Sequence, residues 1–250
     1  MRALILAAGL GNRLQRGPDA PPKCLLEFAG RSLLARHLGI LRRLGIDEVV
    51  LGVGYHAPAI SAELAALGAL SRVATVHNPR FAEGSIVTLW TLGEALACGD
   101  DVLLMDADVL YDARLLERLV SSRHGDCFLL DRDFEPGDEP VKLCLKQGRI
   151  VEFRKRIGDI DYDLCGESVG FFRLTAASAR ELAAIAAGYV AQGRSGEPYE
   201  EALRDLALSP AGAGFGVEDI TGLPWIEIDF PDDVRRAHDD ILPRLAGYAW

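Results

Sequence analysis

The sequence predicts an α/β fold in three layers, α/β/α, in which helices cover both faces of a mostly parallel, Rossmann-like sheet with a small antiparallel insertion. Short runs rich in Val, Ile and Leu alternate with helical patterns, as parallel strands do when crossover helices join them. The pattern then changes to that of a β-hairpin around Gln147-Gly148. Since no internal repeat appears, we expect one domain over residues 1–250, with residues from about 132 to 175 forming the antiparallel lobe.

The apolar runs give the expected strands in order, and the helical patterns give the helices between them. The parallel part has predicted strands at Arg2–Ala8, Glu48–Val53, Arg72–His77, Asp101–Asp106 and Asp126–Asp131. Its predicted helices are Ser32–Leu44, Ala57–Leu67, Ser85–Ala97 and Ala113–Ser122. The hairpin strands Val141–Lys146 and Arg149–Phe153 are followed by a strand at Ser168–Leu174, helices at Ala176–Ala191 and Tyr199–Ala207, a strand at Trp225–Ile228 and a helix from Pro231.

Composition indicates an ordinary globular chain. Of its 250 residues, 49% are hydrophobic and 26% are charged, so a sizeable core can form without disulfides or structural metals. The five cysteines show no CxxC spacing, which argues against a disulfide framework or a zinc site. The apolar start at Ala3–Ala8 breaks at Gly9, so we expect a cytoplasmic protein with no membrane insertion.

The net charge of −10 argues against a nucleic-acid partner, because binding a polyanion requires clustered Lys and Arg. Small anions are still compatible with this charge, since a few side chains and backbone N–H groups can form a local positive pocket. The oligomeric state is open, and a homodimer is one alternative.

A glycine-containing loop follows the first strand, in the segment Leu6–Leu14. Gly9 and Gly11 allow close approach of backbone N–H groups to phosphates, and Arg13 adds a charged guanidinium group that can donate two parallel hydrogen bonds. The segment matches neither the Walker loop nor the dinucleotide fingerprint, which needs a glycine where Leu14 stands. Taken alone it also fits a structural turn. Lys23, next to Pro22, favours the phosphate interpretation because it can fold back over the loop.

Two acidic segments end apolar strands. Asp106 and Asp108 alternate at the end of one strand, and Asp229 ends the segment Trp225–Asp229 far along the chain. The carboxyl ends of parallel strands are where open α/β sheets bind ligands, and carboxylates suit Mg²⁺. For Asp108, a helix N-cap is the competing interpretation.

The segments LAAGLGNRL (6–14) and PKCLLEFAGRSLL (22–34) resemble the opening of the nucleotidyltransferases that activate sugar phosphates and phosphorylated alcohols. The resemblance implies a glycine loop over NTP phosphates, with Arg13, Lys23 and Lys155 as catalytic residues and Mg²⁺ held by Asp108 and Asp229. Asp106 and Glu227 are expected outside the metal's ligands. The spacer Gln15–Pro21 lacks the family's usual Thr- or Ser-rich form, so no contacts are assigned to it.

The same resemblance implies the base-side contacts. Gly52-Val53-Gly54-Tyr55 is similar to the family's segment beside the base, and His77-Asn78-Pro79 with Gly84-Ser85 is similar to the stretch before a base-contacting helix. For Ser85, helix capping is the competing interpretation. The implied nucleotide-binding residues are Leu6, Ala8, Gly9, Gly11, Asn12, Arg13, Lys23, Gly54, Tyr55, Asn78, Gly84, Ser85 and Asp106.

Nearly the whole chain is similar to the CTP-dependent cytidylyltransferases, which act on phosphocholine, 2-aminoethylphosphonate or inositol phosphate. The expected reaction is transfer of CMP from CTP to a small phosphorylated or phosphonylated alcohol or amine. The expected acceptor-binding residues are Lys142, Glu167, Tyr199 and Glu200. The aromatic residues considered as walls for a quaternary ammonium group are Tyr162, Phe171, Tyr199 and Trp225.

Alternatives remain at this point. Lys142 and Lys155 also fit exposed lysines beside a hairpin. The function is alternatively that of a sugar-1-phosphate uridylyl- or thymidylyltransferase. A non-catalytic nucleotide-binding regulatory protein is the alternative from another class, and the acids at the strand ends argue against it.

Overall fold

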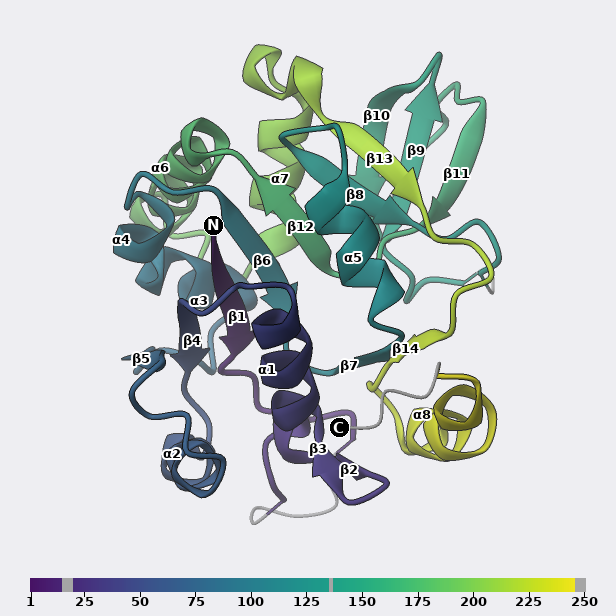
Figure 1. Ribbon diagram of the computed structural model, residues 1–250. Coiled ribbons are helices and arrows are strands. Elements are labelled where there is room, and N and C mark those ends of the chain that lie inside the picture. The colour runs from purple at the N-terminus through teal and green to yellow at the C-terminus, as the bar shows by residue number, and fades with distance from the viewer. Residues whose placement is uncertain (15–19, 135–136, 246–250) are drawn as a thin grey trace.

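A seven-stranded sheet forms the centre of the protein, in a computed structural model that describes residues 1–14, 20–134 and 137–245 (Figure 1). The strand order is β13-β8-β12-β6-β1-β4-β5. The strands are β1 (Arg2–Ala7), β4 (Val49–Val53), β5 (Val73–His77), β6 (Val102–Asp106), β8 (Cys127–Leu130), β12 (Phe171–Leu174) and β13 (Gly216–Asp219).

Most neighbours in this sheet are parallel, as predicted. β1 pairs in parallel with β4 and β6, β4 pairs with β5, and β8 pairs with β13. Only β12, among the strands described, runs against its neighbours β6 and β8. Leu6 is in register with both Gly52 and Asp106, so the ends of three strands meet at one edge.

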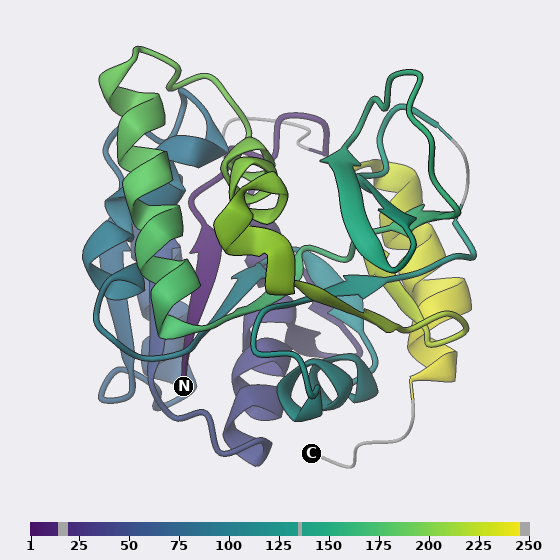
Figure 2. The same ribbon diagram turned by 90° about the horizontal axis from the view of Figure 1, so that it is seen from above.

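Helices cover both faces of the sheet (Figure 2). On one face lie α1 (Leu33–Arg43), α2 (Ala57–Ala66) and α5 (Arg114–Ser121), and on the other lie α3 (Ser85–Thr91), α4 (Gly93–Leu96), α6 (Ala176–Ala191) and α7 (Tyr199–Leu208). The side chains of β1 alternate between the two cores, with Ile5 in one and Leu4 in the other. The three-layer prediction is therefore confirmed.

The antiparallel lobe is a separate three-stranded sheet, in the order β10-β9-β11. Its strands are β9 (Lys142–Lys146), β10 (Arg149–Arg154) and β11 (Leu164–Glu167). Gln147 and Gly148 connect β9 to β10 with φ of 50° and 74°, the positive pair that a tight hairpin turn requires. The lobe is smaller than predicted, because β12 lies in the main sheet, and β11 was missing from the prediction.

Other short elements also escaped prediction. These are β2 (Glu27–Phe28), β3 (Arg31–Ser32), β7 (Val109–Tyr111) and β13, and the helix predicted at Ser85–Ala97 divides at Leu92 into α3 and α4. β7 pairs with β14 (Trp225–Glu227), which precedes α8 (Pro231–Arg236) and the helical turns Ala237–Ile241 and Leu242–Arg244. Within the described ranges, no helix combines the length and the apolar character needed to cross a membrane.

Candidate active site

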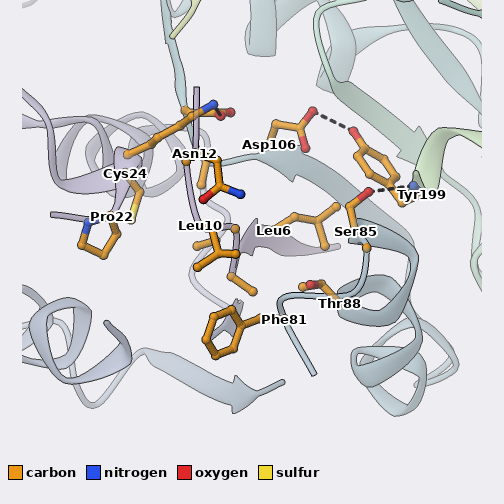
Figure 3. A pocket seen from close by; sticks show the side chains of 18 of the residues that line it. Leu6, Leu10, Asn12, Pro22, Cys24, Phe81, Ser85, Thr88, Asp106 and Tyr199 are labelled. Atoms are coloured by element: carbon orange, nitrogen blue, oxygen red, sulfur yellow. Dashed lines mark hydrogen bonds and ion pairs between the residues drawn. The ribbon is translucent and has the colours of Figure 1, made fainter. Parts of the chain in front are cut away.

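A cavity of about 490 Å³ opens beside the loop that follows β1 (Figure 3). All loop residues from Leu6 to Arg13 line it, together with Lys23 from the next motif. The other lining residues are Pro22, Cys24, Phe81, Ala82, Glu83, Gly84, Ser85, Thr88, Asp106, Ala107, Asp108, Tyr199, Glu200 and Glu227. The structure thus brings together both motifs of the opening sequence and the acidic end of β6.

Three predicted nucleotide contacts support the cavity walls instead of lining them. The backbone N–H of Tyr55 donates to Ala8 O at 3.1 Å, and its hydroxyl donates to Ala20 O at 3.0 Å. Asn78 is buried and its amide donates to Thr88 Oγ1 at 3.0 Å. Gly54, like Tyr55 and Asn78, is not among the residues that line the cavity. Phe81 and Thr88, whose roles the sequence did not suggest, take their place at the surface of the cavity.

Ser85 is not the cap of α3. The N-cap residue is Gly84, and Ser85 Oγ accepts a hydrogen bond from the Tyr199 backbone N–H at 2.9 Å (Figure 3). This bond ties the start of α3 to the start of α7, two helices that are far apart in sequence. The capping interpretation was therefore wrong, and Ser85 lines the cavity as the nucleotide interpretation expected.

Lys23 lies between the two predicted metal ligands. Its Nζ is 2.8 Å from Asp108 Oδ2 and 2.6 Å from Asp229 Oδ1, and all three side chains are mostly buried. Arg13 Nη2 is 2.8 Å from Asp229 Oδ2, so both predicted cations meet at the same carboxylate. Burial opposes the charge on Lys23, but the two aspartates outweigh it and raise the lysine's pKa.

The pairing of β7 with β14 places the carboxylates together. The Ile228 N–H donates to Asp108 O at 3.0 Å, which holds Asp108 beside the end of β14. Since β7 follows Asp108 and α5 begins only at Arg114, the helix-cap interpretation of Asp108 was wrong. Oxygens of Asp108, Glu227 and Asp229 lie within 4.8 Å of one another, so Glu227 joins a set from which the sequence interpretation had excluded it.

This oxygen set suits a hard divalent cation. Three carboxylates in reach of one point, beside a cavity large enough for polyphosphate, match the ligands that Mg²⁺ takes in proteins. The ammonium group of Lys23 already lies between two of them, which shows that the position favours positive charge. A bound metal and Lys23 would therefore share Asp108 and Asp229.

Asp106, which lines the same cavity, is a partly buried acid. Tyr199 donates its hydroxyl proton to Asp106 Oδ2 at 2.7 Å (Figure 3). Burial, followed by the charges of Asp108, Glu200 and Glu227, raises the pKa of Asp106 well above its usual value. Burial also raises the pKa values of Glu200 and Glu227, so this wall of the site holds protons more tightly than exposed acids do.

Replacing Asp106 should change how stability depends on pH. The folded protein holds the Asp106 proton to a higher pH than the unfolded chain, so ionisation of Asp106 destabilises the fold once the pH exceeds the unfolded pKa of about 4. Asp106→Asn keeps an acceptor for Tyr199. We expect it to stabilise the protein, and by more at pH 8 than at pH 5, in urea denaturation. A gain equal at both pH values, as expected of Asp47→Asn on the surface, would contradict the burial argument.

Gly170 makes room for Asp106. It has φ of +78°, and a Cβ at this position would overlap Asp106 Oδ2. Gly148 has a similar φ of +74° but open space around it. We expect Gly170→Ala to lower the free energy of unfolding by about 2 kcal/mol more than Gly148→Ala, because both carry backbone strain and only one adds a clash. Equal losses in urea denaturation would show that Asp106 moves aside freely.

The predicted acceptor-side residues separate into two groups. Lys155 and Glu200 line a second hollow of about 470 Å³ that also includes Arg13, Arg154 and Arg156. Glu200 and Tyr199 line the first cavity as well. Lys142 instead donates to the backbone oxygens of Gly137, Pro140 and Lys155, so it braces the loop that carries Lys155. In the part of the chain that the structure describes, neither Lys142 nor Glu167 lines either of these hollows, so their contact with the acceptor stays a prediction.

The proposed aromatic walls are mostly elsewhere. Phe171 is fully buried against Tyr111 and His37, so its assignment was wrong. Tyr162 is exposed on the lobe. Trp225 donates its indole N–H to Asp131 Oδ2 at 2.7 Å and borders a separate acidic hollow that includes Glu167 and Asp229.

A glycine loop after the first strand of a parallel sheet, next to a cluster of carboxylates, is typical of the nucleotide-binding α/β class. Residues 3–199 match the MobA-like NTP transferase domain, and the chain belongs to this family. The family match therefore makes it a nucleotidyltransferase-type protein.

Two relatives are similar over nearly the whole chain. The CMP-5'-(3-aminopropyl)phosphonate synthase of Streptomyces rubellomurinus is 29% identical over 240 residues, covering 95% of this chain and 38% of the relative. The bifunctional IPC transferase and DIPP synthase of Rubrobacter xylanophilus is 28% identical over 249 residues, covering 96% of this chain and 52% of the relative. The chain thus spans about half or less of the length of these relatives.

A solved structure shares the fold. The inositol-1-phosphate CTP transferase from T. maritima superimposes with a TM-score of 0.73, at 22% identity, and covers 98% of both chains. Together with the strand order described above, this similarity confirms the Rossmann-like nucleotidyltransferase fold.

Proposed function

We propose that this chain transfers CMP from CTP to a small phosphorylated or phosphonylated alcohol or amine, and that Mg²⁺ is required. The observation that carries the proposal is the contact of Lys23 and Asp108, which line the glycine-loop cavity, with Asp229 beside them. The choice of CMP is supported by the Streptomyces relative, whose name states a CMP-phosphonate product. One nucleotidyltransferase domain over residues 1–250 is part of this proposal.

The chemistry needs positioning and charge rather than a protein nucleophile. A phosphate or phosphonate oxygen of the acceptor attacks the α-phosphorus of CTP, a new P–O bond forms, and the bond to pyrophosphate breaks. The glycine loop presents backbone N–H groups to the triphosphate. Arg13 and Lys23, which both line the cavity, stabilise the negative charge that develops on the leaving pyrophosphate.

Asp108, Glu227 and Asp229 would hold the magnesium ion. When bound, Mg²⁺ would neutralise charge between the α-phosphate and the acceptor oxygen. Lys23 remains charged because both aspartates raise its pKa, so it can move from these carboxylates to a phosphate without losing its proton.

The acceptor phosphate or phosphonate fits the hollow that contains Lys155. Arg13, Arg154 and Arg156 also line this hollow, together with the carboxyl groups of Asp138, Glu139, Glu200 and Glu201, and Arg13 lines the glycine-loop cavity too. An anion placed among these cations would therefore lie next to the nucleotide. Arg154 is already paired with Glu201, and Lys155 Nζ is 3.2 Å from Glu139, so these acids hold the cations in place.

The test is pyrophosphate release with Mg²⁺ from CTP, UTP, dTTP, ATP and GTP. Each nucleotide would be combined with 2-aminoethylphosphonate, 3-aminopropylphosphonate, phosphocholine, inositol 1-phosphate and glucose 1-phosphate. We expect turnover with CTP and a non-sugar acceptor. Turnover confined to UTP or dTTP with glucose 1-phosphate would establish the sugar-phosphate alternative instead. No pyrophosphate from any pair, with nucleotide binding intact, would favour a regulatory protein.

A further inference from the structure

A small cavity adjoins the two hollows. Its volume is about 20 Å³, enough for one group the size of a water molecule. It shares Asp106, Tyr199, Glu200 and Glu227 with the glycine-loop cavity, and it shares Lys155 and Glu200 with the second hollow. It is therefore within reach of the tail of an acceptor whose phosphonate lies beside Lys155.

Two polar groups on its wall lack a hydrogen-bond partner among the described residues. Ser168 is 6% exposed, and its Oγ makes no hydrogen bond within that part of the chain. The same holds for the buried oxygen Oε2 of Glu200. Because an unsatisfied buried polar atom costs about 1–3 kcal/mol, a ligand or an ordered water that donates hydrogen bonds to these atoms would stabilise the site.

The chemistry of the wall selects a cation. Three carboxyl groups, those of Asp106, Glu200 and Glu227, line the cavity with a single lysine, Lys155, whose ammonium group already bonds Glu139 at 3.2 Å. A positive charge placed among these acids would relieve the repulsion between them. Phe153 and Phe172, both buried, give the cavity an apolar side. A group with several N–H donors, positive charge and the size of water is a primary ammonium ion.

We propose that this cavity binds the primary ammonium group of the acceptor, with Ser168 Oγ and Glu200 Oε2 accepting two of its hydrogen bonds. The inference rests on the proposed function and narrows its acceptor to an aminoalkyl phosphonate or phosphate. A trimethylammonium group has no N–H donor and adds three methyl groups, so it fits neither the volume nor the acceptors. Ser168 and Glu200 are then the residues that set specificity.

The direct test compares head groups at fixed CTP. kcat/KM would be measured for 2-aminoethylphosphonate and 3-aminopropylphosphonate, for their N-trimethyl derivatives, and for 2-hydroxyethylphosphonate. For the better of the two primary amines, we expect kcat/KM to be at least about 10²-fold higher than for its trimethylated and hydroxyl counterparts. If the kcat/KM values of these acceptors lay within tenfold of one another, this inference would be overturned and CMP transfer would stand. No turnover with any acceptor would overturn both the inference and the proposed function.

Variants of Ser168 separate recognition from folding. Ser168→Ala should raise KM for the amine about 10- to 100-fold, because it removes a hydrogen bond to a charged group, and should leave KM for CTP unchanged. Ser168→Thr keeps the hydroxyl but fills the cavity, so it should also weaken amine binding. Ser61→Ala, on the exposed face of α2, is the matched control. Unchanged KM values in both Ser168 variants would show that the cavity holds only water.

A second inference comes from an independent feature, a pair of cysteines in the lobe. Cys144 on β9 and Cys165 on β11 are directly opposite in the antiparallel register, and their sulfurs are 2.9 Å apart. Opposite residues in antiparallel strands have Cα separations of about 4.5–5.5 Å, within the range of disulfides. Cys144 is buried, and Cys165 is partly exposed.

We propose that Cys144 and Cys165 form a disulfide when the protein meets a peroxide. The thiolate of Cys165 attacks hydrogen peroxide to give a sulfenic acid and hydroxide, and the Cys144 thiol then displaces water to form the S–S bond. In total, two thiols and one peroxide give one disulfide and two waters. Burial raises the pKa of Cys144 to about 12, which is consistent with the more accessible Cys165 reacting first.

Peroxide treatment of the whole chain tests this proposal. Peptide mapping should find Cys144 joined to Cys165, with a loss of two hydrogen atoms in the intact mass and a rise in Tm of about 5–10 °C. Cys165→Ser should abolish the cross-link, and Cys98→Ser, at an exposed thiol, should retain it. Over-oxidised Cys165 with no cross-link would overturn the proposal.

Discussion

Asp229→Asn should reduce kcat about 10³-fold with little change in CTP affinity. Asp229 contacts both Lys23 and Arg13 and belongs to the three-carboxylate set. Losing its charge weakens the metal and frees both cations from their common partner, an effect of several kcal/mol on the transition state. Initial-rate pyrophosphate release measures kcat, and calorimetric titration with CTP measures binding.

The control for this variant is Asp232→Asn. Asp232 lies three residues further on, at the start of α8, where it pairs on the surface with Arg235. The Asp232→Asn variant should retain the wild-type kcat. If Asp229→Asn kept more than a tenth of the activity, Asp229 would not be a metal ligand, and Asp108 with Glu227 would have to suffice.

The contiguous motifs of the site could be predicted from the sequence, whereas the contacts that depend on strand pairing could not. The loop after β1, Pro22-Lys23 and the acids at the ends of β6 and β14 all appear as local motifs. Their contact depends on β7, a strand of three residues, whose pairing with β14 has no periodic signal of its own. A pattern of two or three buried residues cannot be distinguished from a loop, so the position of Glu227 among the ligands was not foreseeable.

The placement of the predicted base-side residues outside the cavity lining has a related cause. Asn78 and Tyr55 stand next to the correct segments, but their polar atoms are used by Thr88, Ala8 and Ala20. Whether a polar side chain faces a ligand or a neighbouring loop depends on tertiary contacts. Likewise, the hydrogen bond from Tyr199 to Asp106 links residues 93 positions apart, and a single sequence gives no signal for it.

Lys23→Met should have two opposite effects, and together they form the sharpest test of the site. Lys23 Nζ occupies the space between Asp108 and Asp229 before any nucleotide binds. Without its charge, kcat should fall about 10³-fold, because a cation that stabilises the leaving pyrophosphate is lost. The nucleotide-free protein should nevertheless bind Mn²⁺ more tightly, because no ammonium group competes for the two carboxylates. Titration calorimetry with Mn²⁺ and pyrophosphate release measure the two effects.

Two further lysine variants separate the position of Lys23 from its charge. Lys146→Met removes an exposed lysine that pairs with Asp161 and Asp163 on the lobe, and it should change neither measurement. Lys23→Arg keeps the charge but should not restore kcat, because a planar guanidinium cannot occupy the space of a compact ammonium between two carboxylates. Weaker Mn²⁺ binding in Lys23→Met would mean that Lys23 organises the carboxylates rather than competing for them, and its role would then be to shape the metal site.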